Sequence, residues 1–208
     1  MKNENFLTDL TRRRYNRVAF LYDLMEAPVE GLRFASWRRR LAGRIAGPTA
    51  LEVGVGTGKN LAYYPQDVRI TAIDFSPRML ARAQKRANKL NLQVDLQEMD
   101  VQHLDFADHS FDTVFATFVF CSVPDPVMGL RELRRVSKPE GRLLLLEHMR
   151  PDHPVLGWLF DVLNPIVVRM MGANINRKTI DNIRLAGWQI KAEENLSSDI
   201  VKIVEAVA

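Results

Sequence analysis

The chain has 208 residues, 47% of them hydrophobic and 26% charged, which is typical of a soluble globular protein with one sizeable α/β domain. The single cysteine, Cys121, excludes an intrachain disulfide. The first residues lack the apolar stretch of a signal peptide, and no run of 18 apolar residues occurs. Both observations favour a cytoplasmic protein without a spanning helix.

The net charge of +4 is unevenly distributed. Residues 1–50 hold ten Lys and Arg against five Asp and Glu, so this segment alone carries +5. Most of the excess lies in TRRR (11–14) and WRRR (37–40). A basic segment of this kind indicates an anionic partner, either a membrane surface or a nucleic acid, although a solvated helix face has the same appearance.

Two helices are predicted at the start of the chain. In the first, residues 6–26, apolar side chains follow Val18 at the spacing of one helix face. Pro28 separates it from a second, basic helix over about 29–46, which Gly47-Pro48 is expected to end.

Short apolar runs then predict strands at about 49–53, 69–73, 93–98, 111–117 and 141–148. Between the later runs lie segments in which apolar residues recur at helical spacing. Ser76-Pro77 and Asp125-Pro126 each combine a capping side chain with a proline at the first helical position. Strands that alternate with helices predict a parallel sheet covered on both faces.

Two later segments depart from this alternation. Residues 155–171 are apolar on nearly all sides, with Pro165 in the middle, and they follow a strand end, where ligand crevices form in such sheets. They are expected to be either buried core or a lid over an apolar substrate. The runs 188–195 and 200–207 have no helix between them and predict an antiparallel hairpin at the sheet edge.

The stretch LEVGVGTGKN (51–60) places Gly54, Gly56 and Gly58 between a predicted strand and the next helix, which is the context of a nucleotide site. Glycine lets the backbone approach a ligand closely. The spacing is G-x-G-x-G, whereas dinucleotide sites use G-x-G-x-x-G, and Lys59 stands at the position of their third glycine. A dinucleotide is therefore disfavoured.

Acidic residues end the next two predicted strands. Asp74, 20 residues after Gly54, can accept hydrogen bonds from both hydroxyls of a ribose. Asp100 can accept one from an adenine amino group, with the backbone amide of Val101 facing the ring. Two such acids combined with this glycine spacing favour an adenosine-containing ligand.

At these residues the sequence resembles the class I S-adenosylmethionine-dependent methyltransferases. The resemblance covers about residues 15–150 and rests on LEVGVGTG, ITAIDFSPRML, MDVQHLDFADHSFDTV and LRELRRVSKPEGRLLLLEH. The chain looks like the group of bacterial phospholipid N-methyltransferases and ubiquinone/menaquinone C-methyltransferases, and RYNRVAFLYDLM is similar to their cofactor-capping segment. The tail, EHMRP followed by GANINRKT, looks closer to the lipid- and thiol-methylating branch.

The resemblance implies a Rossmann-like, seven-stranded, mostly parallel α/β sheet with one antiparallel edge strand, helices on both faces and an N-terminal helical cap. The chain would be a single methyltransferase domain. Its parts would be the cap (1–47), the cofactor-binding core (48–150), a lid or substrate insertion (151–175), and a final helix with the strand hairpin (176–208).

The resemblance also implies S-adenosylmethionine as the cofactor. The three glycines would pass under its methionine moiety, and Glu52 would organise their loop. Asp74 would bind the ribose, with Phe75 against the adenine, whereas Asp100 and Val101 would contact the adenine edge.

Two further pairs of residues would surround the methionine end of the cofactor. Thr117 and Phe118, after the fourth strand, would offer backbone groups to the ammonium. Tyr15 and Tyr22 would close over the carboxylate from the N-terminal helix, and Tyr15 is also a candidate catalytic residue.

Four residues are candidates for contact with the methyl acceptor. His148 ends the fifth strand on the ligand side and is a candidate base or orienting group, although a lone histidine is often structural. Cys121 follows the fourth strand and is otherwise a small buried residue. Asn174 and Arg177, in GANINR, can hold a phosphate head group, unless Asn176 caps a helix there. No metal site is predicted.

The favoured function is methyl transfer to a small lipophilic acceptor, foremost the amine of an ethanolamine phospholipid at the inner, anionic membrane surface. A small thiol or a quinone precursor is the alternative. An RNA methyltransferase would suit the basic N-terminus, but FVFC (118–121) lacks the N-P-P-[YF] motif of base-amino methyltransferases, and we expect no nucleic-acid partner. The oligomeric state remains open.

Overall fold

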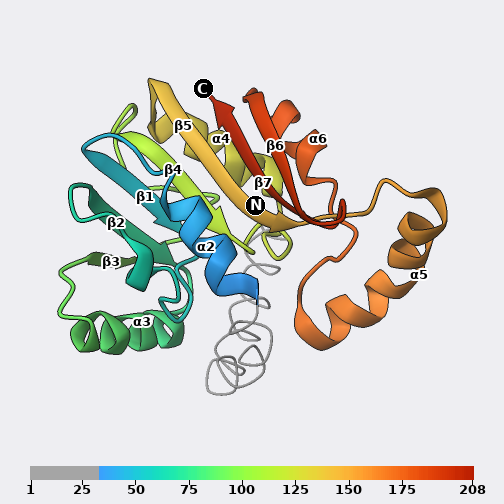
Figure 1. Ribbon diagram of the computed structural model, residues 1–208, viewed down its shortest axis with the longest axis horizontal. Coiled ribbons are helices and arrows are strands. Elements are labelled where there is room, and N and C mark those ends of the chain that lie inside the picture. The colour runs from blue at the N-terminus through green and yellow to red at the C-terminus, as the bar shows by residue number, and fades with distance from the viewer. Residues whose placement is uncertain (1–32) are drawn as a thin grey trace.

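The computed structural model describes residues 33–208, and seven strands form its single sheet in the order β3-β2-β1-β4-β5-β7-β6 (Figure 1). The strands are β1 (Thr49–Val53), β2 (Arg69–Asp74), β3 (Asp95–Glu98), β4 (Phe111–Thr117), β5 (Ser137–His148), β6 (Gln189–Ser197) and β7 (Val201–Val207). The predicted helix 6–26, with Tyr15 and Tyr22, lies outside the described residues, as does the basic run 11–14.

Strands β1 to β5 pair in parallel, whereas β7 runs antiparallel to both β5 and β6. The predicted Rossmann-like, mostly parallel sheet is therefore confirmed. Strands β6 and β7 form the expected hairpin at the sheet edge, and the antiparallel strand is β7, next to the outermost strand. The carboxyl ends of β1, β2 and β4 meet at one edge of the sheet, where ligands bind in such folds.

The helices are α2 (Ala35–Ala42), the 3-10 turn η2 (Leu61–Tyr63), α3 (Pro77–Lys89), α4 (Pro126–Val136), α5 (Pro154–Met171) and α6 (Thr179–Leu185). Two of them begin as predicted. The Ser76 hydroxyl accepts a hydrogen bond from the Met79 amide (3.2 Å), and the Asp125 carboxylate accepts one from the Met128 amide (2.9 Å). These caps fix where α3 and α4 start, beside the two predicted ligand-binding acids.

One predicted helix end is wrong, and the alternative role considered for Asn176 is excluded. Helix α2 ends at Ala42, not near Gly47, because Gly43 follows and the chain tightens into a turn in which Arg44 N donates to Leu41 O (2.9 Å). Helix α6 begins at Thr179, and Asn176 does not cap it. Asn176 instead donates its side-chain amide to Asp161 (3.0 Å), on α5.

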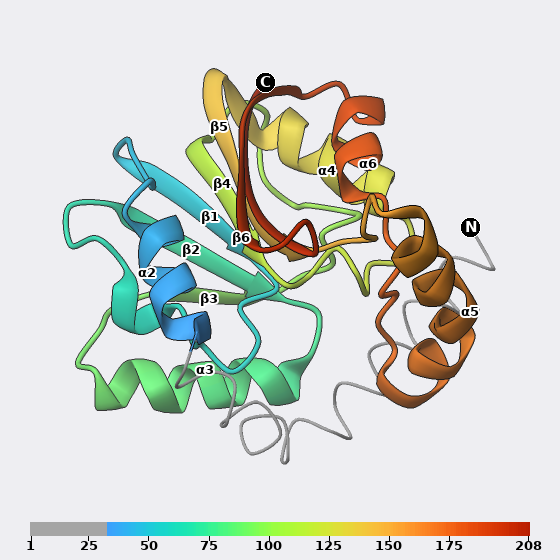
Figure 2. The ribbon, with the colours of Figure 1, turned by 45° about the vertical axis from the view of Figure 1, so that its right-hand side comes forward.

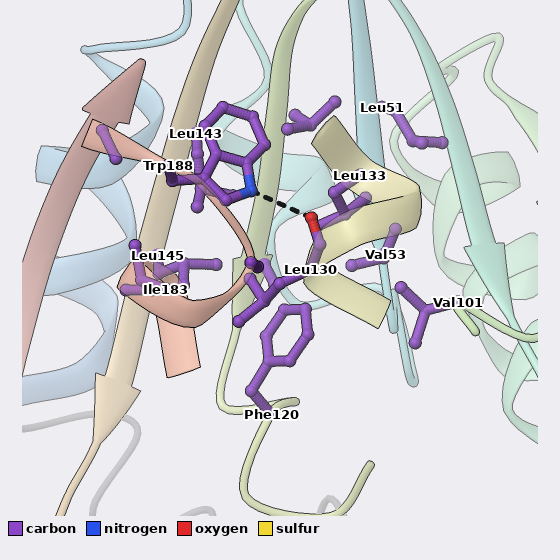
Figure 3. Packing of buried hydrophobic residues seen from close by; sticks show 14 of the residues in the cluster. Leu51, Val53, Val101, Phe120, Leu130, Leu133, Leu143, Leu145, Ile183 and Trp188 are labelled. Atoms are coloured by element: carbon purple, nitrogen blue, oxygen red, sulfur yellow. Dashed lines mark hydrogen bonds between the residues drawn. The ribbon is translucent and has the colours of Figure 1, made fainter. Parts of the chain in front are cut away.

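Alternate residues of the central strands face opposite layers of helices. Leu143 and Leu145 of β5 pack with Leu130 of α4, on the face shown in Figure 3, where the buried indole of Trp188 donates to the Leu130 carbonyl (2.9 Å). Leu144 and Leu146, together with Trp37 of α2, form the core of the other face. The two-residue period of the strand thus accounts for helices on both sides.

Helix α5 stands apart from the sheet, at one side of the molecule (Figures 1 and 2). Six of its apolar side chains are exposed, namely Val155, Trp158, Leu159, Val162, Leu163 and Ile166, whereas others such as Phe160 are half-buried. Of the two expectations for residues 155–171, buried core is therefore wrong. In the described part of the chain, no helix is long and apolar enough to cross a membrane.

Candidate active site

A largely apolar cavity opens at the carboxyl ends of β1, β2 and β4. Its walls include five of the residues predicted to bind the cofactor, Gly54, Asp74, Phe75, Asp100 and Val101. The loop after β4 closes the cavity through Val119 and Val123. Residues from three separate motifs, up to 47 positions apart in the sequence, therefore surround one space.

The glycine loop reaches the cavity at Gly54, and all three of its glycines have positive φ. A side chain at Gly54 or Gly58 would collide with protein atoms, at 2.4 Å from Val119 and 2.6 Å from Leu61. Among the described residues, a Cβ atom at Gly56 (φ +56°) would meet nothing closer than a backbone oxygen at 3.9 Å. Gly56 is thus the position where bare backbone faces open space, as close approach to a ligand requires.

Asp74 ties the end of β2 to this loop. Its two carboxylate oxygens accept hydrogen bonds from the amides of Gly56 and Ser76, each at 2.9 Å. Burial raises the pKa of Asp74 to about 6, although the two amides oppose the shift. Each oxygen keeps a second lone pair, so the carboxylate can also accept hydrogen bonds from a ligand.

Asp100 has a different local partner. Its carboxylate accepts hydrogen bonds from the backbone amide (2.9 Å) and the side-chain amide of Gln102, which hold it at the cavity wall. Val101, beside it, is buried in the core shared with α4. The pair therefore presents one acceptor and one apolar surface at the same end of the cavity.

Glu52, at the end of β1, is the centre of a buried hydrogen-bond network. Its carboxylate accepts from the Asn60 side-chain amide (2.5 Å) and from the Tyr64 hydroxyl. Asn60 also donates to the Thr117 hydroxyl (2.9 Å) and accepts from the Arg38 guanidinium (2.9 Å). Burial raises the pKa of Glu52 to about 7. The network joins β1, β4 and α2 behind the glycine loop.

The loop after β4 is held by a second buried acid, Glu147 of β5. One of its carboxylate oxygens accepts hydrogen bonds from the amides of Val119 (2.7 Å) and Phe120 (3.0 Å). Phe118 takes a left-handed conformation (φ +57°) and donates its amide to Leu146 (2.8 Å). Such strain in a non-glycine residue is concentrated at functional sites. Because the amide of Phe118 already donates to Leu146, and a cation needs an acceptor, any contact of Phe118 with a cationic group must use its carbonyl.

Known proteins resemble this chain over both sequence and fold. A family model described as a methyltransferase domain matches residues 51–145. A phosphatidylethanolamine N-methyltransferase from Cereibacter sphaeroides is 39% identical over 69% of this chain and 70% of its own length. A demethylmenaquinone methyltransferase from Lactobacillus johnsonii is 33% identical over 78% of this chain and 71% of its own length.

A solved SAM-dependent methyltransferase from Thermotoga maritima has the same fold, with a TM-score of 0.71 over 94% of this chain and 98% of that one, at 21% identity. The chain belongs to the S-adenosylmethionine-dependent methyltransferases. Its cofactor is S-adenosylmethionine. The cavity of this methyltransferase fits that group, because the carboxylates of Asp74 and Asp100 stand at its wall, and Gly56, bonded to Asp74, carries no side chain on its outer side.

His148 does not line the cofactor cavity of the methyltransferase. It ends β5 opposite Val201, and burial lowers its pKa. Its Nε2 atom is buried and has no hydrogen-bond partner among the described residues. A neutral imidazole of this kind can accept a proton, so its predicted role remains a proposal.

Three predicted acceptor-site residues come together beside the loop after β4. The backbone and side-chain amides of Asn174 donate to the Cys121 carbonyl (2.8 and 3.1 Å), and Arg177 donates to the Val123 carbonyl (2.6 Å). Burial and the nearby Glu147 raise the pKa of the Cys121 thiol to about 12, so no thiolate nucleophile forms there. Asn174 and Arg177 thus fasten the segment after α5 to the cofactor loop.

Sequence reasoning missed four residues of the site, namely Arg38, Asn60, Tyr64 and Glu147. Asn60 and Glu147 lie inside quoted motifs, where their position at a loop or strand end was the available signal. Arg38 was included in a basic run interpreted as solvated or membrane-facing, but only 6% of it is exposed. Tyr64 carries no sequence signal.

Glu147→Gln is expected to change how stability depends on pH. Burial raises the pKa of Glu147 from 4.5 to about 7, so between these values the folded chain binds more protons than the unfolded chain. The contribution of Glu147 to the free energy of unfolding therefore falls as pH rises through that window, by up to about 3 kcal/mol. Glutamine keeps an oxygen acceptor for both amides without the charge. Urea unfolding should show that the free energy of unfolding of the variant rises relative to that of the wild type between pH 5 and 8.

In this comparison Glu52 and Asp74 are present in both proteins, so their own titration cancels from the difference. If the difference in the free energy of unfolding between variant and wild type stays constant from pH 5 to 8, the pKa of Glu147 is not raised by folding.

Proposed function

We propose that this methyltransferase transfers a methyl group to the amine of an ethanolamine phospholipid at a membrane surface. The observation that carries the proposal is α5, an exposed apolar helix that follows the strand ends bordering the site. The relative from Cereibacter sphaeroides, named for the same acceptor, supports it. The predicted lid or substrate insertion, residues 151–175, would then contact lipid.

The chain's own groups are suited to position an acceptor and keep water away. S-adenosylmethionine supplies a methyl group already activated on a sulfonium. A neutral amine then needs orientation more than chemical activation, because alignment of the reacting atoms provides most of the acceleration. Val119 and Val123 give the cavity apolar walls, which disfavour water beside the reacting groups. Methylation of a neutral amine gives an ammonium, and His148, neutral because burial lowers its pKa, is the proposed acceptor of the proton that this ammonium releases.

A quinone precursor is the second candidate acceptor, because relatives such as that of Lactobacillus johnsonii are named for demethylmenaquinone. Methylation at carbon needs removal of a proton by a general base. Transfer of labelled methyl groups to vesicles of phosphatidylethanolamine, to demethylmenaquinone and to small thiols separates the candidates. We expect the phospholipid to be methylated fastest. Transfer to the quinone alone would overturn the proposal in favour of the second candidate.

Membrane contact through α5 can be followed by tryptophan fluorescence. Of the three tryptophans, Trp37 and Trp188 are buried, whereas Trp158 on α5 is 62% exposed. Apolar insertion together with attraction between the basic N-terminal segment and anionic lipid predicts reversible binding that weakens as salt rises. Anionic vesicles should therefore shift the emission of Trp158 to shorter wavelength.

The matched control is Trp158→Phe, which should still co-sediment with anionic vesicles but show no emission shift. Ile166→Ser, on the same helix, should weaken co-sedimentation. If vesicles change neither the emission of Trp158 nor the sedimentation of the protein at any salt concentration, the membrane proposal is contradicted and a small water-soluble acceptor is favoured.

A further inference from the structure

A second cavity, of about 410 Å³, lies beside the first and is strongly polar. It is bordered by the segment after β5, the start of α6 and the facing strands β6 and β7. Five cationic side chains line it, Arg150, Arg177, Lys178, Arg184 and Lys202, against three acidic ones, Asp152, Asp181 and Glu193. The lining therefore carries an excess of positive charge.

The acidic residues neutralise some of these cations and not others. Lys202 pairs with Glu193 (3.2 Å) and more distantly with Asp152 (3.8 Å). Arg150 pairs with Asp161 of α5 (2.9 Å).

The remaining three cations hold the uncompensated charge. Arg184 reaches only Asp181, at 3.9 Å, with both side chains largely exposed. Arg177 and Lys178 have no ion-pair partner within residues 33–208. Asp125 and Glu147 act on Arg177 electrostatically, and Asp161 acts on Lys178, but none of these three acids lines the cavity.

Two buried polar atoms of lining residues also lack partners. The Thr179 hydroxyl belongs to a residue that is 1% exposed, and it makes no hydrogen bond within the described chain. The Nε atom of Arg177 is likewise buried without a partner. Buried donors left unpaired cost free energy and are uncommon in native proteins, so each calls for an acceptor, either an ordered water or a bound group. A phosphoryl group offers several charged acceptor oxygens, which suit guanidinium, ammonium and hydroxyl donors together.

We propose that this second cavity binds a phosphoryl group through Arg177, Lys178 and Thr179. The site is coupled to the cofactor cavity, because Arg177 also donates to the carbonyl of Val123, which lines that cavity. Under the proposed function, on which this part rests, the phosphoryl group is the phosphodiester of the acceptor lipid. A free phosphate or soluble phosphate ester has the same chemistry and is the other source.

Binding is measured by calorimetry on the full chain with inorganic phosphate and with glycerophosphoethanolamine, without any methyl transfer. The test variants are Lys178→Ala and Thr179→Val, whereas Arg177 is left unchanged because it also fastens the loop. Lys191→Ala, an exposed lysine of β6 outside the cavity, is the matched control. We expect millimolar affinity that each test variant lowers at least about fivefold and the control leaves unchanged.

Absence of binding at tens of millimolar, or equal weakening by Lys178→Ala and Lys191→Ala, would overturn the site. Methylation of phosphatidylethanolamine vesicles then identifies the source of the phosphoryl group. A raised KM with unchanged kcat in Lys178→Ala assigns the site to the lipid head group. Phosphate binding that falls while lipid methylation is unaffected supports the site and assigns it to free phosphate. Phosphate binding in a protein that methylates no phospholipid leaves the site standing and refutes the proposed function alone.

Discussion

Asp74→Ala is expected to lower the affinity for S-adenosylmethionine at least about tenfold. The substitution removes an acceptor for the ribose hydroxyls, and hydrogen bonds with one charged partner contribute about 1.5–3 kcal/mol each, where 1.4 kcal/mol is already tenfold. It also leaves the amides of Gly56 and Ser76 without their acceptor, which loosens the glycine loop. Calorimetric titration at pH 7.5 measures the change.

The same residue predicts a pH dependence of cofactor binding. Because the pKa of Asp74 is raised to about 6, the carboxylate becomes protonated as pH falls through that value, and affinity should decline there in the wild type. Asp67→Ala, an exposed acid that precedes the other end of β2, is the matched control. A folded Asp74→Ala protein that binds the cofactor as tightly as Asp67→Ala would remove Asp74 from the site.

The sheet and two of its helices were predictable because their signals are local. Apolar runs separated by helical spacing indicate parallel strands, and a capping residue followed by proline places the start of α3 and of α4. The ligand-binding edge follows from these elements, because strand ends in a parallel sheet converge. For that reason Gly54, Asp74 and Asp100 were found together without any knowledge of tertiary contacts.

The parts that escaped prediction depend on contacts between distant residues. Arg38 turns inward to contacts that include a hydrogen bond to Asn60, 22 residues away, and a run of three arginines does not reveal which one does so. Glu147 holds the loop after β4 across a strand pairing that exists only in the folded chain. Helix α5 is apolar on nearly all sides, a pattern that usually indicates burial, yet six of its large apolar residues are exposed.

Gly56→Ala and Gly58→Ala are expected to fail in different ways, although they lie two residues apart in one loop. At Gly58 (φ +79°) the new methyl would lie 2.6 Å from Leu61 and 3.1 Å from the backbone of Ala83. Left-handed strain and overpacking together should cost on the order of 3 kcal/mol, which lowers the melting temperature by roughly 10 °C.

At Gly56 (φ +56°) the methyl meets open space within residues 33–208, so this part of the chain bears only the conformational cost of about 1–2 kcal/mol. The methyl nevertheless occupies the side of the backbone that the cofactor is expected to approach. Gly56→Ala should therefore lower affinity for S-adenosylmethionine more than about tenfold while it melts only a few degrees below the wild type. Melting curves and calorimetric titrations of both variants measure the contrast. Wild-type affinity in Gly56→Ala would mean that the cofactor does not lie against this turn, and the fit between the glycine loop and the cofactor would then be wrong.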